Sequence, residues 1–183
     1  MSAARYTRTA IVLHWVAAIL ILGNVAFGLY MVGLPLSPAK LRYYSWHKWI
    51  GVSVLLLSAA RLLWRLGHAA PSLPRDMPPW QKRAAHASHH LLYALFFAVP
   101  LAGWLFSSAA GFPVVFLGVV PLPDLVPKSR ELADALKVVH RIAAWSLGAL
   151  ALVHAAAAVK HHVVDRDDVL VRMLPFLKPR NRP

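Results

Sequence analysis

The sequence predicts an all-α integral membrane protein, a four-helix bundle, and two observations lead to this fold class. Hydrophobic residues make up 58% of the 183 residues, which exceeds the share typical of a soluble domain. No charged side chain interrupts the ranges 9–39, 84–123 and 142–159, and each range is long enough to cross a hydrocarbon core of about 30 Å. Cysteine is absent, so any metal must be held by nitrogen or oxygen ligands.

We expect four membrane spans within a single domain of residues 1–183. The spans cover residues 9–32, 45–66, 86–108 and 137–162. The first span is read as a retained helix, because its apolar run is too long for a signal peptide. The second span requires Lys48, Arg61 and Arg65 to extend their charged ends toward the headgroups, since its uncharged part is short. The apolar, Pro-interrupted range 111–127 is expected to cap the outer end of the bundle.

The distribution of Lys and Arg predicts the orientation of the chain. Thirteen lie in the N-terminal tail, the second connection and the C-terminal tail, whereas seven lie in the other two connections. The positive-inside rule therefore places both termini in the cytoplasm. The net charge of +13 is spread over both membrane faces, so membrane lipid is the expected partner and nucleic acid is not.

Four histidines fall at matching depths in these spans. His140 and His154 are fourteen residues apart, which separates them by about 21 Å along a helix and by only about 40° around it. His14 lies near the cytoplasmic end of the first span, and His47 lies near the outer end of the second. These depths pair His14 with His154 and His47 with His140.

Two imidazoles that face each other at each depth predict two haem b groups. Each imidazole supplies one axial nitrogen to a six-coordinate iron, and the flat macrocycle fills the apolar gap between the helices. Zinc would need three or four ligands gathered together. Gly51 and Gly148 lie near the pairs and leave room for a porphyrin. Because both axial positions are filled, the expected role is outer-sphere electron transfer.

Four motifs carry a resemblance to a known family, namely LHW (13–15), WHKWIGVSVLLLSAARLLWR (46–65), VHRIAAWSLGALALVHAAAAVKHH (139–162) and DDVLVRMLP (167–175). They resemble the bacterial cytochrome b561 family, which implies a four-helix, di-haem cytochrome b of the inner membrane with the same two histidine pairs as iron ligands. The chain length and a short C-terminal amphipathic helix, expected over 166–174, are most similar to the superoxide:ubiquinone oxidoreductase branch. This branch implies an enzyme that oxidises superoxide at the periplasmic face and reduces ubiquinone in the membrane.

His161 is the residue best placed to bind the quinone. It follows His154 by seven residues and so falls on nearly the same helix face, and the resemblance favours a quinone pocket there. An imidazole titrates near neutral pH and can relay the protons that quinone reduction consumes. His86 and His90, one turn apart, are further candidates. For all three the alternative is a polar residue at the interface, and His89 is expected to be solvated.

Charged residues give two further hypotheses. Arg61 lies fourteen residues after His47, at the depth of the inner pair, and it either binds haem propionates or extends to the headgroups. A set of outer cations would steer the superoxide anion toward the outer pair. This set comprises Lys40, Arg42, Lys48, Lys128, Arg130, Lys137 and Arg141. Ordinary interfacial Lys and Arg would have the same pattern, so both interpretations stay open.

Two other functions also stay open. The chain is alternatively a cytochrome b subunit that exchanges electrons between the quinone pool and a periplasmic protein, with the basic outer face as the docking patch. Outside redox chemistry, a small transporter or assembly factor would use the histidines to pair helices or to move protons. The spans contain no Asp or Glu, which disfavours proton transport.

Overall fold

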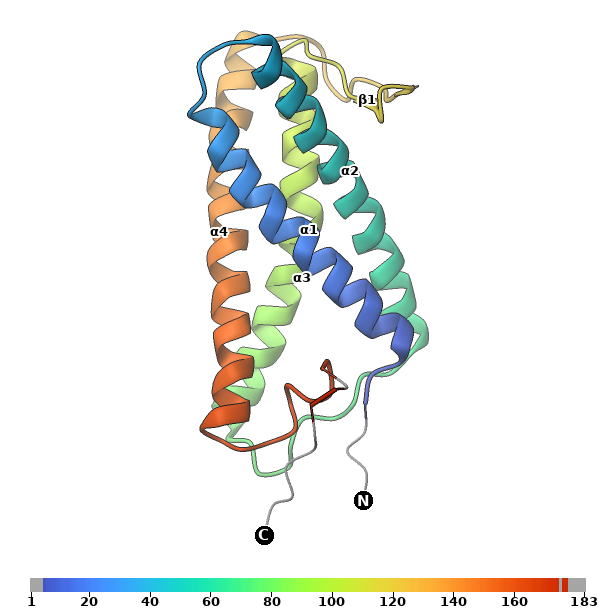
Figure 1. Cartoon of the computed structure of the whole chain (residues 1–183), viewed down its shortest axis with the longest axis vertical. Coiled ribbons are helices and arrows are strands. Elements are labelled where there is room, and N and C mark those ends of the chain that lie inside the picture. Colours follow the sequence, from blue (N-terminus) through green and yellow to red (C-terminus); the bar gives the residue numbers. More distant parts are fainter. Residues whose placement is uncertain (1–4, 175, 178–183) are drawn as a thin grey trace.

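Four long apolar helices form the bundle, as the sequence predicts (Figure 1). They are α1 (Arg8–Val32), α2 (Pro38–Gly67), α3 (Pro79–Ala109) and α4 (Arg130–Val163). Each helix is long and apolar enough to span a membrane. The structure is a computed structural model that describes residues 5–174, 176 and 177. Three of the cations used to predict the orientation, Lys178, Arg180 and Arg182, lie outside the described residues.

The helices α2, α3 and α4 each begin seven residues before the expected spans, because their N-terminal caps lie outside the apolar runs. The Ser37 hydroxyl accepts a hydrogen bond from the Lys40 N–H at 3.2 Å, and Pro38 follows as the first helical residue. Ser129 caps α4 in the same way and accepts from the Leu132 N–H at 3.3 Å. Hydropathy therefore locates the part of each helix that crosses the hydrocarbon, whereas capping residues set where the helix starts.

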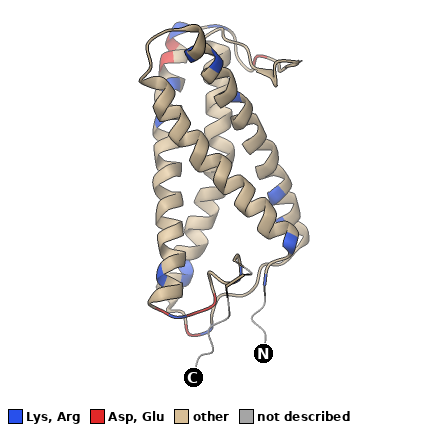
Figure 2. Ribbon diagram, viewed as in Figure 1, with Lys and Arg blue, Asp and Glu red and all other residues tan. Residues whose placement is uncertain are grey.

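The start of α1 and the end of α4 lie at one end of the bundle, together with the α2–α3 connection (Figure 1). We call this the inner end, and we call the end with the α1–α2 and α3–α4 connections the outer end. Lys and Arg gather toward these two ends and are sparse along the middle of the helices (Figure 2). An even number of crossings returns the chain to its starting side, which is what four spans require.

The middle of the bundle is an apolar core to which all four helices contribute. Its buried members are Ala17, Ile21, Val54, Leu92, Phe96, Val99 and Leu147. Leu147 on α4 is 2% exposed and lies seven residues from both His140 and His154. The core therefore occupies the depth between the two predicted histidine pairs.

The α3–α4 connection lies at the outer end and contains a short antiparallel hairpin of β1 (Val115–Phe116) and β2 (Val120–Pro121). Residues 117–119 connect the two strands, and Leu117 and Gly118 have positive φ angles of 54° and 76°. Two α2 side chains hold the connection. The Trp49 indole N–H donates to the Val115 carbonyl at 2.6 Å, and the Lys48 Nζ donates to the Phe112 carbonyl at 3.0 Å.

The segment 166–174 differs from the expected amphipathic helix, because it forms a series of turns that fold back under the inner end. Val171 is fully buried, and the Trp15 indole N–H donates to the Met173 carbonyl at 2.8 Å. The Asp167 carboxylate accepts from the Val169 N–H at 3.0 Å. A hydrogen bond from the backbone to a nearby side chain competes with the hydrogen bonds of a regular helix. The segment therefore contains single helical hydrogen bonds, such as Leu174 N–H to Leu170 O, but no continuous helix.

Candidate functional site

The four histidines that the sequence pairs by depth face each other in the bundle. The ring centroids of His14 and His154 are 6.3 Å apart, and those of His47 and His140 are 6.2 Å apart. An iron bonded to two imidazoles at about 2 Å, with each ring centre roughly 1 Å further away, separates the ring centres by about 6 Å. The spacing of both pairs therefore fits bis-histidine coordination of one iron each.

At the outer pair, His140 has the hydrogen bonding of a metal ligand. Its Nδ1 lies 3.0 Å from the Val99 carbonyl oxygen on α3, and because a carbonyl only accepts, Nδ1 carries the hydrogen. The lone pair is then on Nε2, and a backbone carbonyl that fixes the tautomer in this way is typical of metal-binding histidines. The His47 Nδ1 is buried and has no hydrogen-bond partner among the described residues. Buried polar atoms in proteins are normally hydrogen-bonded, so an unpaired imidazole nitrogen here is consistent with a histidine that binds a cofactor.

Two glycines that were not predicted from the sequence lie against the outer imidazoles. A Cβ added to Gly103 on α3 would lie 2.9 Å from the His140 Cε1, and one added to Gly28 on α1 would lie 3.0 Å from the His47 Cε1. A side chain at either position would push the imidazole away, so the two rings pack directly against helix backbones. By contrast, a Cβ at Gly51 meets no atom within 4 Å, and one at Gly148 makes an ordinary 3.5 Å contact with Val25.

At the inner pair, Arg61 reaches the depth that its position predicts, but it contacts a histidine. Its Nη2 lies 3.0 Å from the His14 Nδ1. A guanidinium only donates, so the His14 Nδ1 accepts, which is the reverse of the arrangement at His140. The guanidinium also lies over the rings of Tyr93 and Phe96, at 5.3 and 5.8 Å from their centroids. The inner site is thus polar on one side and aromatic on the other.

A third imidazole joins the inner pair. The ring centroid of His89 on α3 lies 5.2 Å from that of His154. The residue is exposed on α3, but its ring lies beside a candidate ligand, a contact that was not predicted from the sequence. A positional signal was present, because His89 precedes Gly103 by fourteen residues, the same interval that separates His140 from His154.

The candidate quinone residues do not come together. His161 lies in the last turn of α4, where its Nδ1 contacts the Asp167 Oδ2 at 2.7 Å and the Asp165 Oδ2 at 3.0 Å. Its side chain is 14% exposed. His86 and His90 are exposed on α3, and neither makes a hydrogen bond or ring contact with His161 in the described part of the chain. The two carboxylates were not among the residues predicted for this site.

The seven outer cations divide into three groups. Lys128, Arg130 and Lys137 line a hollow of about 400 Å³ between the end of α3 and the start of α4, together with Asp134. Lys40 and Lys48 instead donate to backbone carbonyls, with Lys40 Nζ 3.2 Å from the Val32 oxygen. The remaining two, Arg42 and Arg141, are exposed. The three cations of the hollow are the ones that lie together around a space large enough for a small anion.

Comparison with known proteins gives a family match over nearly the whole chain. The sequence profile of prokaryotic cytochrome b561 matches residues 5–176. Cytochrome b561 homolog 2 of Escherichia coli (strain K12) is 35% identical over 178 residues, which cover 93% of this chain and 91% of that protein. The probable superoxide oxidase CybB of Yersinia pestis is 29% identical over 181 residues, covering 93% and 96% of the two chains. The chain is therefore a member of the prokaryotic cytochrome b561 family, membrane electron-transfer proteins that bind b-type haem.

Proposed function

We propose that this single-domain chain is a di-haem membrane oxidoreductase, a superoxide:quinone oxidoreductase that oxidises superoxide at the periplasmic face and reduces ubiquinone in the membrane. The observation that carries the proposal is the presence of two opposed histidine pairs, with ring centroids 6.3 and 6.2 Å apart, on either side of the apolar core. His14 with His154 would hold the inner haem b, and His47 with His140 the outer one. Bound haem supplies reversible one-electron chemistry at its iron.

Residues around each histidine pair would help that pair to bind its haem. Val99 holds His140 in the tautomer that leaves Nε2 free, and Gly28 and Gly103 let the outer rings approach the helix backbones. At the inner site, iron binding through the His14 Nε2 requires Arg61 to release Nδ1. A propionate carboxylate is the acceptor that suits a released guanidinium, since the two form paired charge-assisted hydrogen bonds.

Superoxide would approach at the outer end. The hollow lined by Lys128, Arg130 and Lys137 raises the local concentration of a small anion by long-range attraction. The relative named probable superoxide oxidase CybB supports this substrate. The inner end, with both termini, would face the cytoplasm of a bacterium whose inner membrane holds the protein, because the larger share of Lys and Arg flanks that end.

Ubiquinone would be reduced near the inner end. His161 lies there in the last turn of α4 with a largely buried side chain, and it would bind a quinone oxygen and supply protons. His86 and His90 lie on α3 at the same end and are kept as secondary candidates for the rim of this pocket.

The experiment uses the purified protein in lipid nanodiscs. A reduced-minus-oxidised spectrum should show a b-type α-band with two haems per chain. Superoxide should then reduce a soluble ubiquinone analogue with no other protein present. Substitution of Ala for His47 or His140 should remove the outer haem, and substitution of Ala for His14 or His154 the inner one. A colourless preparation that retains full activity would refute the proposal.

A second candidate function is supported by the exposed cations of the outer end. Arg42, Arg130 and Arg141 are exposed there and would dock an acidic periplasmic protein that exchanges electrons with the quinone pool through this chain. The same spectrum is expected in both cases. Superoxide-driven quinone reduction by the protein alone distinguishes them, because the second function requires the partner.

A further inference from the structure

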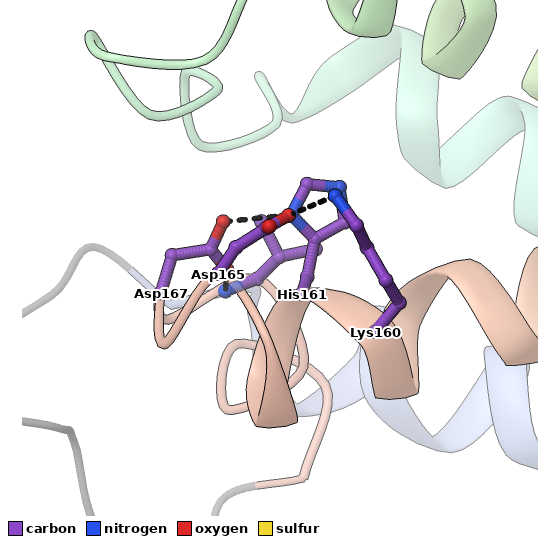
Figure 3. Close-up of polar contacts among 5 residues, drawn as sticks. Lys160, His161, Asp165 and Asp167 are labelled. Carbon is purple, nitrogen blue, oxygen red and sulfur yellow. Dashed lines mark hydrogen bonds and ion pairs between the residues drawn. The ribbon is translucent and has the colours of Figure 1, made fainter.

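The chain reverses direction after α4 and returns an acid to the helix end. Arg166 has a positive φ of 53°, and the Asp167 N–H donates to the His161 carbonyl at 3.1 Å. Asp167 is 5% exposed, and its Oδ1 accepts from the Val169 N–H at 3.0 Å. The backbone on both sides of Asp167 therefore fixes its carboxylate, and the second oxygen, Oδ2, is directed at His161 (Figure 3).

This contact determines where the hydrogen of His161 lies. The Asp167 Oδ2 is 2.7 Å from Nδ1. A carboxylate accepts and does not donate, so Nδ1 carries a hydrogen and donates it to Asp167. In the described part of the chain no residue is hydrogen-bonded to the other ring nitrogen, Nε2. That nitrogen is then the one able to exchange a proton with a bound molecule.

We propose that Asp167 is a positioning residue for quinone reduction, which fixes His161 in the Nδ1–H form so that Nε2 delivers the protons. The inference rests on the proposed function and deepens it. Asp167 acts through His161 and does not itself become protonated, in the way that the buried acid of a carboxylate–histidine pair orients its imidazole. It also stabilises the imidazolium form, in which Nε2 carries the hydrogen to be given.

The step balances in atoms and charge. Two superoxide anions each lose one electron and become dioxygen, and the quinone gains these two electrons together with two protons. Each proton passes from Nε2 to a quinone oxygen, forms one O–H bond and leaves Nε2 with a lone pair. Nδ1 keeps its hydrogen on Asp167 throughout, and Nε2 is reprotonated from cytoplasmic water.

Asp165 also contacts the ring, but it is less suited to this role. Its Oδ2 is 3.0 Å from Nδ1 and is shared with the Lys160 ammonium at 2.7 Å. Its side chain is 27% exposed, compared with 5% for Asp167. The lysine offsets its charge and water screens it, so Asp165 serves as the matched control: the same residue type on the same nitrogen.

The test is Asp167→Asn in the haem-loaded protein. The Val169 N–H still needs an acceptor, so the amide oxygen stays on that side and the NH₂ group turns toward His161. Nδ1 must then accept, and the neutral ring carries its hydrogen on Nε2. This ring can still donate a hydrogen bond to a quinone oxygen. However, its Nε2 already carries a hydrogen and has no lone pair with which to accept a further proton. We expect KM for the quinone to stay within about twofold while kcat falls about 100-fold, the lower end of general acid–base effects.

Two further measurements separate positioning from folding. Nitrogen-15 NMR of histidine-labelled protein, with His161→Gln to assign the resonance, should show Nδ1–H in the wild type and Nε2–H in Asp167→Asn. The rate at which superoxide reduces the haems should be the same in both, whereas Asp165→Asn should leave kcat within about twofold of the wild type. An unchanged kcat in Asp167→Asn, or equal losses in Asp165→Asn and Asp167→Asn, would overturn the proposal. A wild type whose haems accept electrons from superoxide but pass none to quinone would instead overturn the proposed function.

Discussion

Gly103→Ala should remove the outer haem while leaving the inner one in place. The added Cβ would lie 2.9 Å from the His140 Cε1 and 3.1 Å from its Nδ1. Carbon atoms in contact sit about 3.5–4.0 Å apart, so the ring must retreat by roughly 0.6 Å or more. The hydrogen bond from Nδ1 to the Val99 carbonyl, now 3.0 Å, would lengthen to a distance at which little of it survives.

The size of the effect follows from these two losses. Overpacking of a close contact costs about 1–3 kcal/mol, and loss of the hydrogen bond adds about 0.5–1.5 kcal/mol. The combined cost of about 1.5–4.5 kcal/mol corresponds to a drop of roughly 10- to 2,000-fold in affinity for the outer haem. Haem content per chain, measured by extraction and by the α-band, should therefore fall from two toward one.

Gly23→Ala is the matched control for this substitution. It makes the same change within α1, at an exposed position where a Cβ meets no atom within 4 Å. Two haems should be retained there. If Gly103→Ala also kept two haems and an unaltered outer redox potential, the His140 ring would not pack against Gly103 in the haem-bound protein, and the prediction would be wrong.

Three more outcomes are expected. Gly28→Ala should weaken the outer haem through the His47 ring, because its Cβ would lie 3.0 Å from Cε1; equal loss of both haems on a titration of haem content would contradict this. Arg61→Ala should lower inner haem content or shift only the inner potential in a redox titration, since Arg61 contacts His14, whereas Arg65→Ala should change neither. Replacing Lys128 and Lys137 by Gln should slow superoxide oxidation about 3- to 10-fold at low salt and flatten its salt dependence, as lost steering requires; an unchanged stopped-flow rate would exclude steering by the hollow.

The four-helix fold could be predicted from the sequence, because every segment that crosses a bilayer must meet the same two requirements. A span needs a long uncharged run, and its backbone must be satisfied within the helix. The residues between Trp49 and Ala60 are the shortest such run, and α2 still forms over 30 residues, because a Ser-Pro cap starts it and Arg61 and Arg65 extend it at the inner end. Helix starts were missed by seven residues where capping, rather than hydropathy, decides them.

The histidines could be paired from the sequence by their depth in the membrane. This depth follows from the rise per residue along each helix and does not depend on how the helices pack. The partners of each histidine could not be predicted in the same way. Asp167 reaches His161 only because the segment after α4 folds back around the buried Val171. The contact of Arg61 with His14 depends on how α1 crosses α2. Both contacts depend on side-chain directions and helix crossings, which periodicity does not encode.

A fourteen-residue interval recurs on all four helices and includes site residues other than the four paired histidines. Every helix carries two site residues fourteen positions apart: His14 and Gly28 on α1, His47 and Arg61 on α2, His89 and Gly103 on α3, and His140 and His154 on α4. Fourteen residues are close to four turns, so each pair stays on one helix face and spans about 21 Å. At the outer depth two helices supply imidazoles and the other two supply glycines, against which those imidazoles rest. At the inner depth three helices supply imidazoles and the fourth supplies a guanidinium. The two ends thus share one geometry but differ in chemistry, so two haems held there would differ in potential, and that difference would favour electron transfer in one direction across the bundle.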